Sequence, residues 1–209
     1  MNFILTSPSL DDLIRLLKAW RFWVLGAILG AILGVAIYYM IPPPFHARAT
    51  VNVDFNLEQA WPQDTDRQQF YYLERESRKL EEIAWSDDVM GHLSSQFAFP
   101  VEDLRGDKLQ LSQPAEAGWH FYADDSDSQI AASLASVWAE AFVARAQADV
   151  NSGAINEFVK LEVTQSANLP IERRTSISGY LLAGSVGFLT FAVFVLLFID
   201  PKSRDADKR

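Results

Sequence analysis

The chain has 209 residues, 49% of them hydrophobic, and a formal net charge of −9 at pH 7. The negative charge is concentrated in residues 42–176, where 22 Asp and Glu outnumber 11 Lys and Arg. An acidic domain repels other polyanions, which argues against nucleic acid as a partner. The absence of cysteine excludes disulfides and cysteine nucleophiles.

The first 21 residues predict an amphipathic helix. Leu10, Leu13, Leu17 and Trp20 fall on one helical face. Acidic residues stand at the start of this helix and basic residues at its end, which suits the helix dipole. We expect residues 1–21 to lie at the cytoplasmic surface of a membrane and to lead into the next segment.

Two uncharged apolar segments, 22–41 and 177–199, lie towards the ends of the chain. Each reaches the roughly 20 residues that an α-helix needs to cross a hydrocarbon core of about 30 Å. The layout predicts two transmembrane helices that flank one folded domain. For the first segment a cleaved signal peptide is the alternative, because Ala47-Arg48-Ala49 offers a cleavage site, but the apolar run is about twice the usual length of a signal core.

Small residues recur every four positions in both apolar segments. They are the candidates for helix packing or oligomerisation: Gly26, Gly30, Gly34, Gly179, Ala183 and Gly187. Small side chains let helix backbones approach closely in lipid. The spacing therefore predicts helix pairing, either within one chain or between chains.

Basic residues beside the apolar segments predict that both termini are cytoplasmic. Three precede the first segment and four follow the second: Arg15, Lys18, Arg21, Lys202, Arg204, Lys208 and Arg209. Basic residues next to a span favour the cytoplasmic side, whereas a long loop translocates largely regardless of its charge. We therefore expect residues 42–176 to be extracytoplasmic despite Arg173 and Arg174, and residues 200–209 to form a cytoplasmic tail.

Residues 42–176 predict an α+β fold, in which helices lie on one face of an antiparallel sheet. The apolar–polar alternation and the helical periodicity give the elements in order: strand 49–55, helix 66–84, helix 86–97, strands near 109–111 and 119–123, and a helix from about 127 to 150. The helical pattern then resumes through Ala154, Phe158 and Leu161. Possible capping boxes pair Thr65 with Gln68 and Ser126 with Gln129.

The helix expected at residues 66–84 has two faces. Its narrow apolar face holds Phe70, Leu73, Leu80 and Ile83. Its polar face mixes charges of both signs and is either solvated or available for contacts between copies: Glu74, Arg75, Arg78, Lys79, Glu81 and Glu82.

No pattern in the chain predicts catalysis, a metal or a cofactor. The three histidines stand in separate elements without ligand spacing, and the acidic run from Asp124 to Asp127 reads as a helix start, because it lacks the calcium-loop pattern. The apolar segments contain no ionisable side chain, which argues against a transporter. Of the six tryptophans, only Trp61 and Trp85 are candidates for surface recognition of a sugar, and packing is the simpler reading of both.

Five stretches occur in a characteristic order within this two-span frame: Leu10–Trp23, Pro44–Phe55, Ile83–Phe97, Trp119–Arg145 and Gln165–Arg174. The five stretches resemble segments of the chain-length determinant (Wzz-type) family of polysaccharide co-polymerases. In the same order, these segments are the helix that leads into the first span, the strand after the membrane, a short helix, a strand-turn-helix segment and the proline-bearing return to the second span. The return motif of the family falls on Pro170 here. The chain resembles a short form of this family, because no GxxxxGK[ST] loop of a fused kinase is present and residues 150–167 leave room for only a short helical arm.

The resemblance implies a non-catalytic, oligomeric regulator of the chain length or export of a surface polysaccharide (O-antigen, capsule or exopolysaccharide) in a bacterial inner membrane. The implied partners are further copies of the chain and a polysaccharide polymerase or lipid-linked glycan. One alternative is a membrane adaptor that activates a separate cytoplasmic tyrosine kinase through residues 202–209. Another is a structural membrane protein that self-assembles and is unrelated to glycans.

Overall fold

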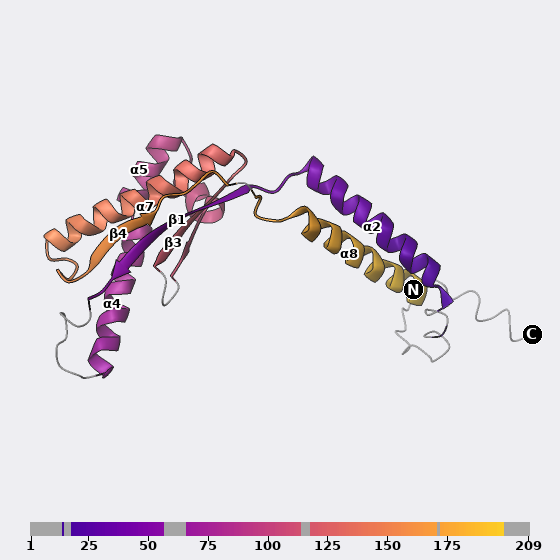
Figure 1. Cartoon of the computed structure of the whole chain (residues 1–209), viewed down its shortest axis with the longest axis horizontal. Helices are drawn as coiled ribbons and strands as arrows, with labels where there is room; N and C mark the ends of the chain where they lie inside the picture. The colour runs from indigo at the N-terminus through magenta and orange to yellow at the C-terminus, as the bar shows by residue number, and fades with distance from the viewer. Residues whose placement is uncertain (1–13, 15–17, 57–65, 114–117, 171, 199–209) are drawn as a thin grey trace, which may run out of the picture. The chain divides into compact units, whose positions relative to one another are not determined.

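The computed structural model describes residues 14, 18–56, 66–113, 118–170 and 172–198 of the chain. The chain divides into two compact units (Figure 1). One unit holds the two apolar helices, and the other, residues 44–174, is an α+β domain. Most of the helix expected in residues 1–21, the tail 200–209, Trp61 and the Thr65–Gln68 capping box lie outside the part whose structure and side chains are described.

The two apolar segments form helices close to their predicted limits. Helix α2 spans Trp20–Met40 and helix α8 spans Ile177–Phe198. Figure 1 shows the two helices side by side along their length. By length and composition both can cross a membrane.

The domain contains one four-stranded sheet, which confirms the predicted α+β class. Its strands are β1 (Phe45–Asp54), β2 (Leu109–Ser112), β3 (Trp119–Asp125) and β4 (Lys160–Gln165). The strand order is β2-β3-β1-β4, and every neighbouring pair is antiparallel. The long β1 pairs with β3 from its first residue, whereas its pairing with β4 begins only at Thr50.

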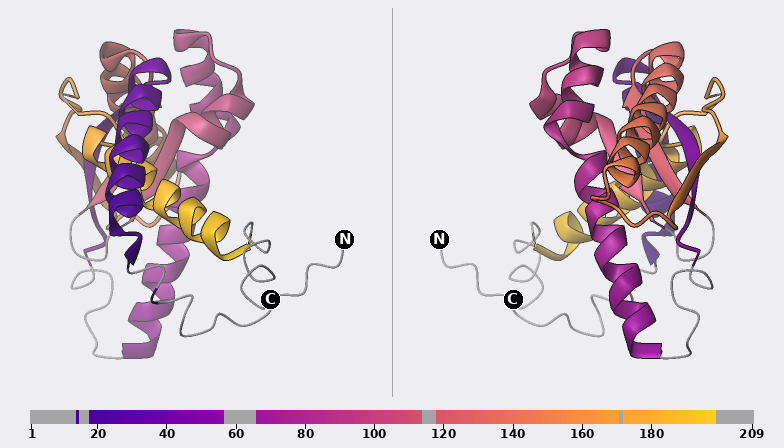
Figure 2. Two further views of the ribbon diagram at one scale, coloured as in Figure 1. Left: turned by 90° about the vertical axis from the view of Figure 1, so that its right-hand side faces the viewer. Right: turned by 90° about the vertical axis from the view of Figure 1, so that its left-hand side faces the viewer.

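Helices cover one face of this sheet (Figure 2). They are α4 (Asp66–Ala84), α5 (Asp87–Phe97), the short α6 (Val101–Asp103) with the π-helical turn η1 (Leu104–Lys108), and α7 (Ser128–Asn151). Helix α7 lies directly on β1, β3 and β4, and α4 and α5 pack against α7. Buried alanines along α7 let its backbone approach the sheet closely: Ala131, Ala132, Ala135, Ala139 and Ala146.

Aromatic side chains fill the space between α7 and the sheet. Phe121 of β3 contacts Trp138 edge-to-face, with ring centroids 4.8 Å apart, and Phe142 at 5.0 Å. Trp119 stacks on Phe142 at 5.6 Å. Trp85, at the end of α4, packs against Trp138 with a centroid distance of 4.9 Å. Trp85 therefore belongs to the packing of the core rather than to a surface for sugars.

The opposite face of the sheet carries polar side chains. Buried Ala47 and Ala49 point from β1 into the core, so Arg48 and Thr50 between them point the other way. His120 and Tyr122 extend this polar face across β3, where they are register partners of Thr50 and Arg48. Among the described residues no helix of the α+β domain packs on this face.

Strand β4 occupies the place where the periodicity predicted a resumed helix, so that prediction is wrong. Helix α7 ends at Asn151, and Gly153 then adopts φ +80°, which turns the chain back. Residues 159–164 alternate between core and solvent, and Val159 and Leu161 are buried. Ala154, Phe158 and Leu161 happen to be spaced as on a helix, and this spacing produced the wrong prediction. The alternation typical of a strand begins only after Phe158.

The buried face of α4 also differs from the predicted one. Phe70 is 63% exposed, whereas the helix buries Tyr72, Glu76, Leu80 and Ala84 at four-residue spacing. Figures 1 and 2 show the first turns of α4 extending beyond the sheet, which explains why an aromatic ring there remains in solvent. This buried face was not predicted because one of its four positions holds a charged residue, Glu76.

The cap of α7 lies one residue later than predicted. The Asp127 carboxylate, not the Ser126 hydroxyl, accepts hydrogen bonds from the backbone N–H groups of Gln129 and Ile130. The cap of α5 follows the expectation, since the Ser86 hydroxyl accepts from the N–H of Val89 at 3.4 Å.

Trp138→Phe should destabilise the domain. The indole N–H of Trp138 donates to the Ala84 carbonyl at 2.9 Å inside the core, so the change leaves a buried carbonyl without a donor and opens a small cavity. We expect the free energy of unfolding to fall by about 1–3 kcal/mol, measured by denaturant unfolding of the full chain in detergent. The control Tyr71→Phe, at a 67% exposed side chain, should cost less than about 0.5 kcal/mol. Equal stability of the Trp138 variant and the wild type would contradict the assigned role.

Candidate functional site

Helices α2 and α8 meet through glycines. A Cβ atom on Gly30 would clash with the carbonyl oxygen of Gly184, and one on Gly184 would clash with that of Gly30. A Cβ on Gly34 would clash with the carbonyl oxygen of Tyr180. The backbones are therefore in direct contact, and the Ser185 hydroxyl adds a hydrogen bond of 3.1 Å to the Ala27 carbonyl across the pair.

The structure places the predicted small residues in three different situations. Gly30 and Gly34 are buried in the contact between α2 and α8. Gly26 and Gly187 have open space where a Cβ would be, and Ala183 is exposed. Gly179 faces Thr175, which lies two residues before its helix begins.

Gly184, which the sequence analysis missed, supplies the contact on α8. It lies one position past Ala183, on the face shared with Tyr180 and Phe188. The spacing of small residues selected a neighbouring face, because Tyr180 and Phe188 interrupt the small-residue repeat on the face that actually packs.

The start and the end of the α+β domain are joined by one carboxylate. Asp124, 8% exposed at the end of β3, contacts the Nδ1 of His46 at 2.5 Å and the guanidinium of Arg174 at 2.7 Å. The backbone N–H of Arg174 also donates to the carbonyl of Pro44 at 2.9 Å. We call Asp124, His46 and Arg174 the clasp. It fixes the first and last residues of the domain next to each other.

Two further contacts reinforce the clasp. Phe45 and Arg173 form an antiparallel bridge, and the Arg173 guanidinium lies 4.3 Å from the centroid of the Phe45 ring. The stretch Asp124–Asp127 thus serves both as the helix start that the sequence predicted and as the acceptor of the clasp.

Asp125 anchors the neighbouring turn. It is 5% exposed and accepts hydrogen bonds from the Lys108 ammonium at 2.6 Å and from the backbone N–H of Asp127 at 2.9 Å. Burial raises the pKa of Asp125, but the bonds from Asp127, Lys108 and Ser126 and the charge of Lys108 outweigh it, so the pKa lies below its usual value.

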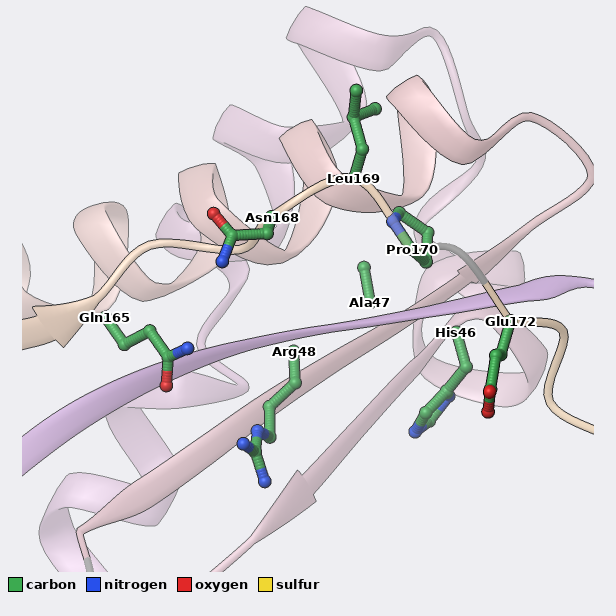
Figure 3. Close-up of a pocket in the computed structure, with 8 residues that line it drawn as sticks. All are labelled: His46, Ala47, Arg48, Gln165, Asn168, Leu169, Pro170 and Glu172. Atoms are coloured by element: carbon green, nitrogen blue, oxygen red, sulfur yellow. The ribbon is translucent and has the colours of Figure 1, made fainter.

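A groove runs along the edge of β1 beside the clasp (Figure 3). Its volume is about 430 Å³, and its lining residues are His46, Ala47, Arg48, Gln165, Asn168, Leu169, Pro170 and Glu172. One wall is β1, and the other is the segment that follows β4, which we call the strap (residues 166–170 and 172). The backbone N–H of Ala167 donates to the Ser136 hydroxyl of α7 at 2.9 Å, and the clasp holds the far end of the strap. The groove therefore lies between two fixed walls, and Pro170 lies in the strap.

The groove has one cation with no partner in the described part of the chain. Arg48 is exposed, and neither an ion pair nor a hydrogen bond to its guanidinium occurs among the described residues. His120 lies near it on the sheet face, with its Nδ1 3.2 Å from the Thr50 hydroxyl. Burial, and then the charge of Arg48, lower the pKa of His120, which keeps the imidazole neutral at pH 7.

Some charged side chains of α4 are bound within the domain, and the others are exposed to solvent. Glu76 is fully buried and accepts from Lys79 at 3.2 Å, from Arg75 at 2.9 Å and from the backbone N–H of Asn156 at 3.3 Å. The Lys79 ammonium also donates to the carbonyl of Ala154 at 2.8 Å, so these residues fasten α4 to the turn after α7. The remaining members of the predicted face are exposed: Glu74, Arg75, Arg78, Glu81 and Glu82.

No group of three or more metal-ligating side chains gathers among the described residues. His46 belongs to the clasp, His120 lies on the polar face of the sheet, and His92 is exposed on α5. A scan against protein-family models finds no family that matches the chain, and a search of curated proteins finds no relative.

Gly30→Leu should separate α2 from α8, because a side chain there has no room beside the Gly184 carbonyl. The chain has no native cysteine, so Ala27→Cys combined with Ser185→Cys provides a specific disulfide reporter of the pair. We expect this reporter to form readily in the otherwise wild-type chain in detergent and several-fold less with Gly30→Leu. Gly187→Leu is the matched control, since a Cβ there meets nothing within 4 Å. Cross-linking that Gly30→Leu leaves unchanged would rule out the glycine contact.

Asp125 should make the domain sensitive to acid. Its folded-state pKa lies below the unfolded value of about 3.9, so its contribution to stability is present above that pH and is lost as the pH falls through the folded pKa. We expect the stability difference between the wild type and Asp125→Asn, from thermal melts, to be constant between about pH 7 and 5 and to shrink below about pH 4. A difference that persists unchanged to pH 2 would contradict this assignment.

Proposed function

We propose that the chain is a two-span protein of a bacterial inner membrane whose extracytoplasmic domain regulates the chain length or export of a surface polysaccharide without catalysing a reaction. One observation carries the proposal: residues 44–174 form an α+β domain whose two ends meet at the clasp, and the apolar segments that flank this domain in the chain form helices that pair with each other. The resemblance of five ordered stretches to chain-length determinants supports the same frame.

The proposed mechanism is geometric. Copies of the chain assemble side by side and hold a polymerase, or the lipid-linked glycan that grows on it, and the size of the assembly biases when elongation stops. In this arrangement both termini are cytoplasmic and residues 42–176 are extracytoplasmic.

Two surfaces are available for contacts between copies. The pairing of α2 with α8 uses Gly30, Gly34 and Gly184 and leaves Gly26, Ala183 and Gly187 free of that contact, so these small residues are the candidates within the membrane. In the domain, the exposed charges of α4 are the corresponding candidates. The buried Glu76 and its partner Lys79 are excluded, because they hold α4 in place.

Deletion of the gene should shift or abolish the modal length of the surface or extracellular polysaccharide, resolved on a gel. The intact protein should restore the wild-type distribution, whereas Gly30→Leu should not, because it separates the two apolar helices. An unchanged distribution and yield after deletion would refute the proposed function.

A truncation separates this role from that of a kinase adaptor. Removal of residues 202–209 should leave the glycan distribution unchanged if the domain acts on the polymerase. If the truncation instead reduces phosphorylation of a cytoplasmic tyrosine kinase and changes the glycan together with it, the adaptor replaces the proposed mechanism.

A further inference from the structure

The groove beside β1 combines side chains that have no partners among the described residues. Arg48, Gln165, Asn168 and Glu172 all line it and are exposed, and none of their side chains makes an ion pair or hydrogen bond within the described part of the chain. The remaining polar side chain of the groove, His46, is bound to Asp124. At about 430 Å³ the groove has the size of small-molecule sites, which range from about 300 to 1,000 Å³.

The chemistry of the free side chains differs along the groove. Figure 3 shows Arg48 and Gln165 near one end, and Glu172 beside His46 at the other. A guanidinium recognises a carboxylate or phosphate through paired hydrogen bonds. An amide both donates and accepts, and a carboxylate accepts from hydroxyl groups. The groove thus offers an anion-binding end and a hydroxyl-binding end.

An apolar lip completes the groove. Leu169, 58% exposed, and the half-buried Pro170 stand on the strap between the two ends. A sugar ring presents apolar C–H surface as well as hydroxyl groups, so a ligand with one acidic group, several hydroxyls and an apolar face matches all the lining residues. A purely anionic ligand leaves Glu172 unexplained, since that carboxylate repels it.

We infer that this groove binds an acidic saccharide, a sugar unit that carries a carboxylate or a phosphate, with Arg48 on the acidic group and Gln165, Asn168 and Glu172 on hydroxyls. The inference rests on the proposed function and names the ligand class that the domain recognises. A free Arg48 is informative here because residues 42–176 carry twice as many acidic as basic residues, yet none of the described acids pairs with it.

An extended peptide is the competing occupant. On the side of the groove, residues 46–49 of β1 have no partner strand among the described residues, so a peptide could add to this edge. The free stretch is only four residues long between the Phe45–Arg173 bridge and Thr50, and the polar side chains of the strap line its open side. These features favour a compact polar ligand over a β-strand.

Binding is tested with the full-length chain in detergent by isothermal titration calorimetry. The probes are a glucuronate-containing hexasaccharide, glucose 1-phosphate and the neutral maltohexaose. We expect at least one acidic probe to bind and maltohexaose to bind about tenfold more weakly or not at all. The two acidic probes separate a carboxylate from a phosphate as the group that Arg48 recognises.

Variants assign the binding to the groove. Arg48→Gln should weaken the acidic probe roughly tenfold or more, the loss expected for a charge-assisted pair. Arg78→Gln is the matched control, because its side chain is 73% exposed on α4, away from the groove, and it should change nothing. Glu172→Gln should not weaken binding of the acidic probe, since it removes a negative charge that repels the probe. Thermal melts confirm that the exposed substitutions leave the fold intact.

Hydrogen exchange distinguishes the occupants. The acidic probe should protect the strap and leave the backbone N–H groups of residues 46–49 exchanging as before, whereas an added peptide strand would protect that edge. Equal binding of neutral and acidic probes, unchanged affinity of Arg48→Gln, no binding at millimolar concentration, or protection of the β1 edge each overturns the inference. Binding to the groove together with unchanged glycan length after gene deletion would refute the proposed function alone, and the reverse combination would refute the inference alone.

Discussion

The Asp124 carboxylate is the constraint on which the rest of the domain depends. It lies at the end of β3 and accepts from two side chains more than 120 residues apart in the chain, His46 and Arg174. Hydrogen-bonding partners at 2.5 and 2.7 Å compensate the cost of its near-complete burial, which an unpaired carboxylate could not sustain. The same contacts set the direction in which β1 starts and the strap ends, and thus both walls of the groove.

The distribution of helices gives the sheet two different faces. The alanines of α7 and the aromatic cluster around Trp138 concentrate the apolar burial on one side, so the other side needs no cover and can carry charge. Arg48 stands on that polar side next to the gap that opens where β4 departs from β1. The groove is therefore a consequence of sheet topology: β4 pairs with only half of β1, and the strap bows away from the remainder.

Patterns local in the chain were predictable from the sequence, and contacts between distant segments were not. The alternation of Ala49, Val51 and Val53 predicted the first strand within a few residues, and the length of the apolar segments did the same for both long helices. The β4 strand was missed because three apolar residues before and within it happen to match a helical period. Glu76 was missed as a core residue because its burial depends on Lys79 and on a backbone N–H 80 residues away. The clasp and the Gly30–Gly184 contact were not predicted for the same reason, because the fold brings together residues that lie far apart in the chain. The acidic run at Asp124 and the glycines of the first apolar segment stood out in the sequence, but their partners did not.

The bridge between Phe45 and Arg173 has a consequence for the modularity of the chain. Residues opposite each other in an antiparallel bridge have Cα atoms about 5 Å apart, so the domain begins and ends at nearly the same point. A unit with adjoining ends can be excised, or inserted into a surface loop of another protein, without stretching the host backbone. Residues 44–174 therefore form a unit whose adjoining ends suit it for transfer between proteins.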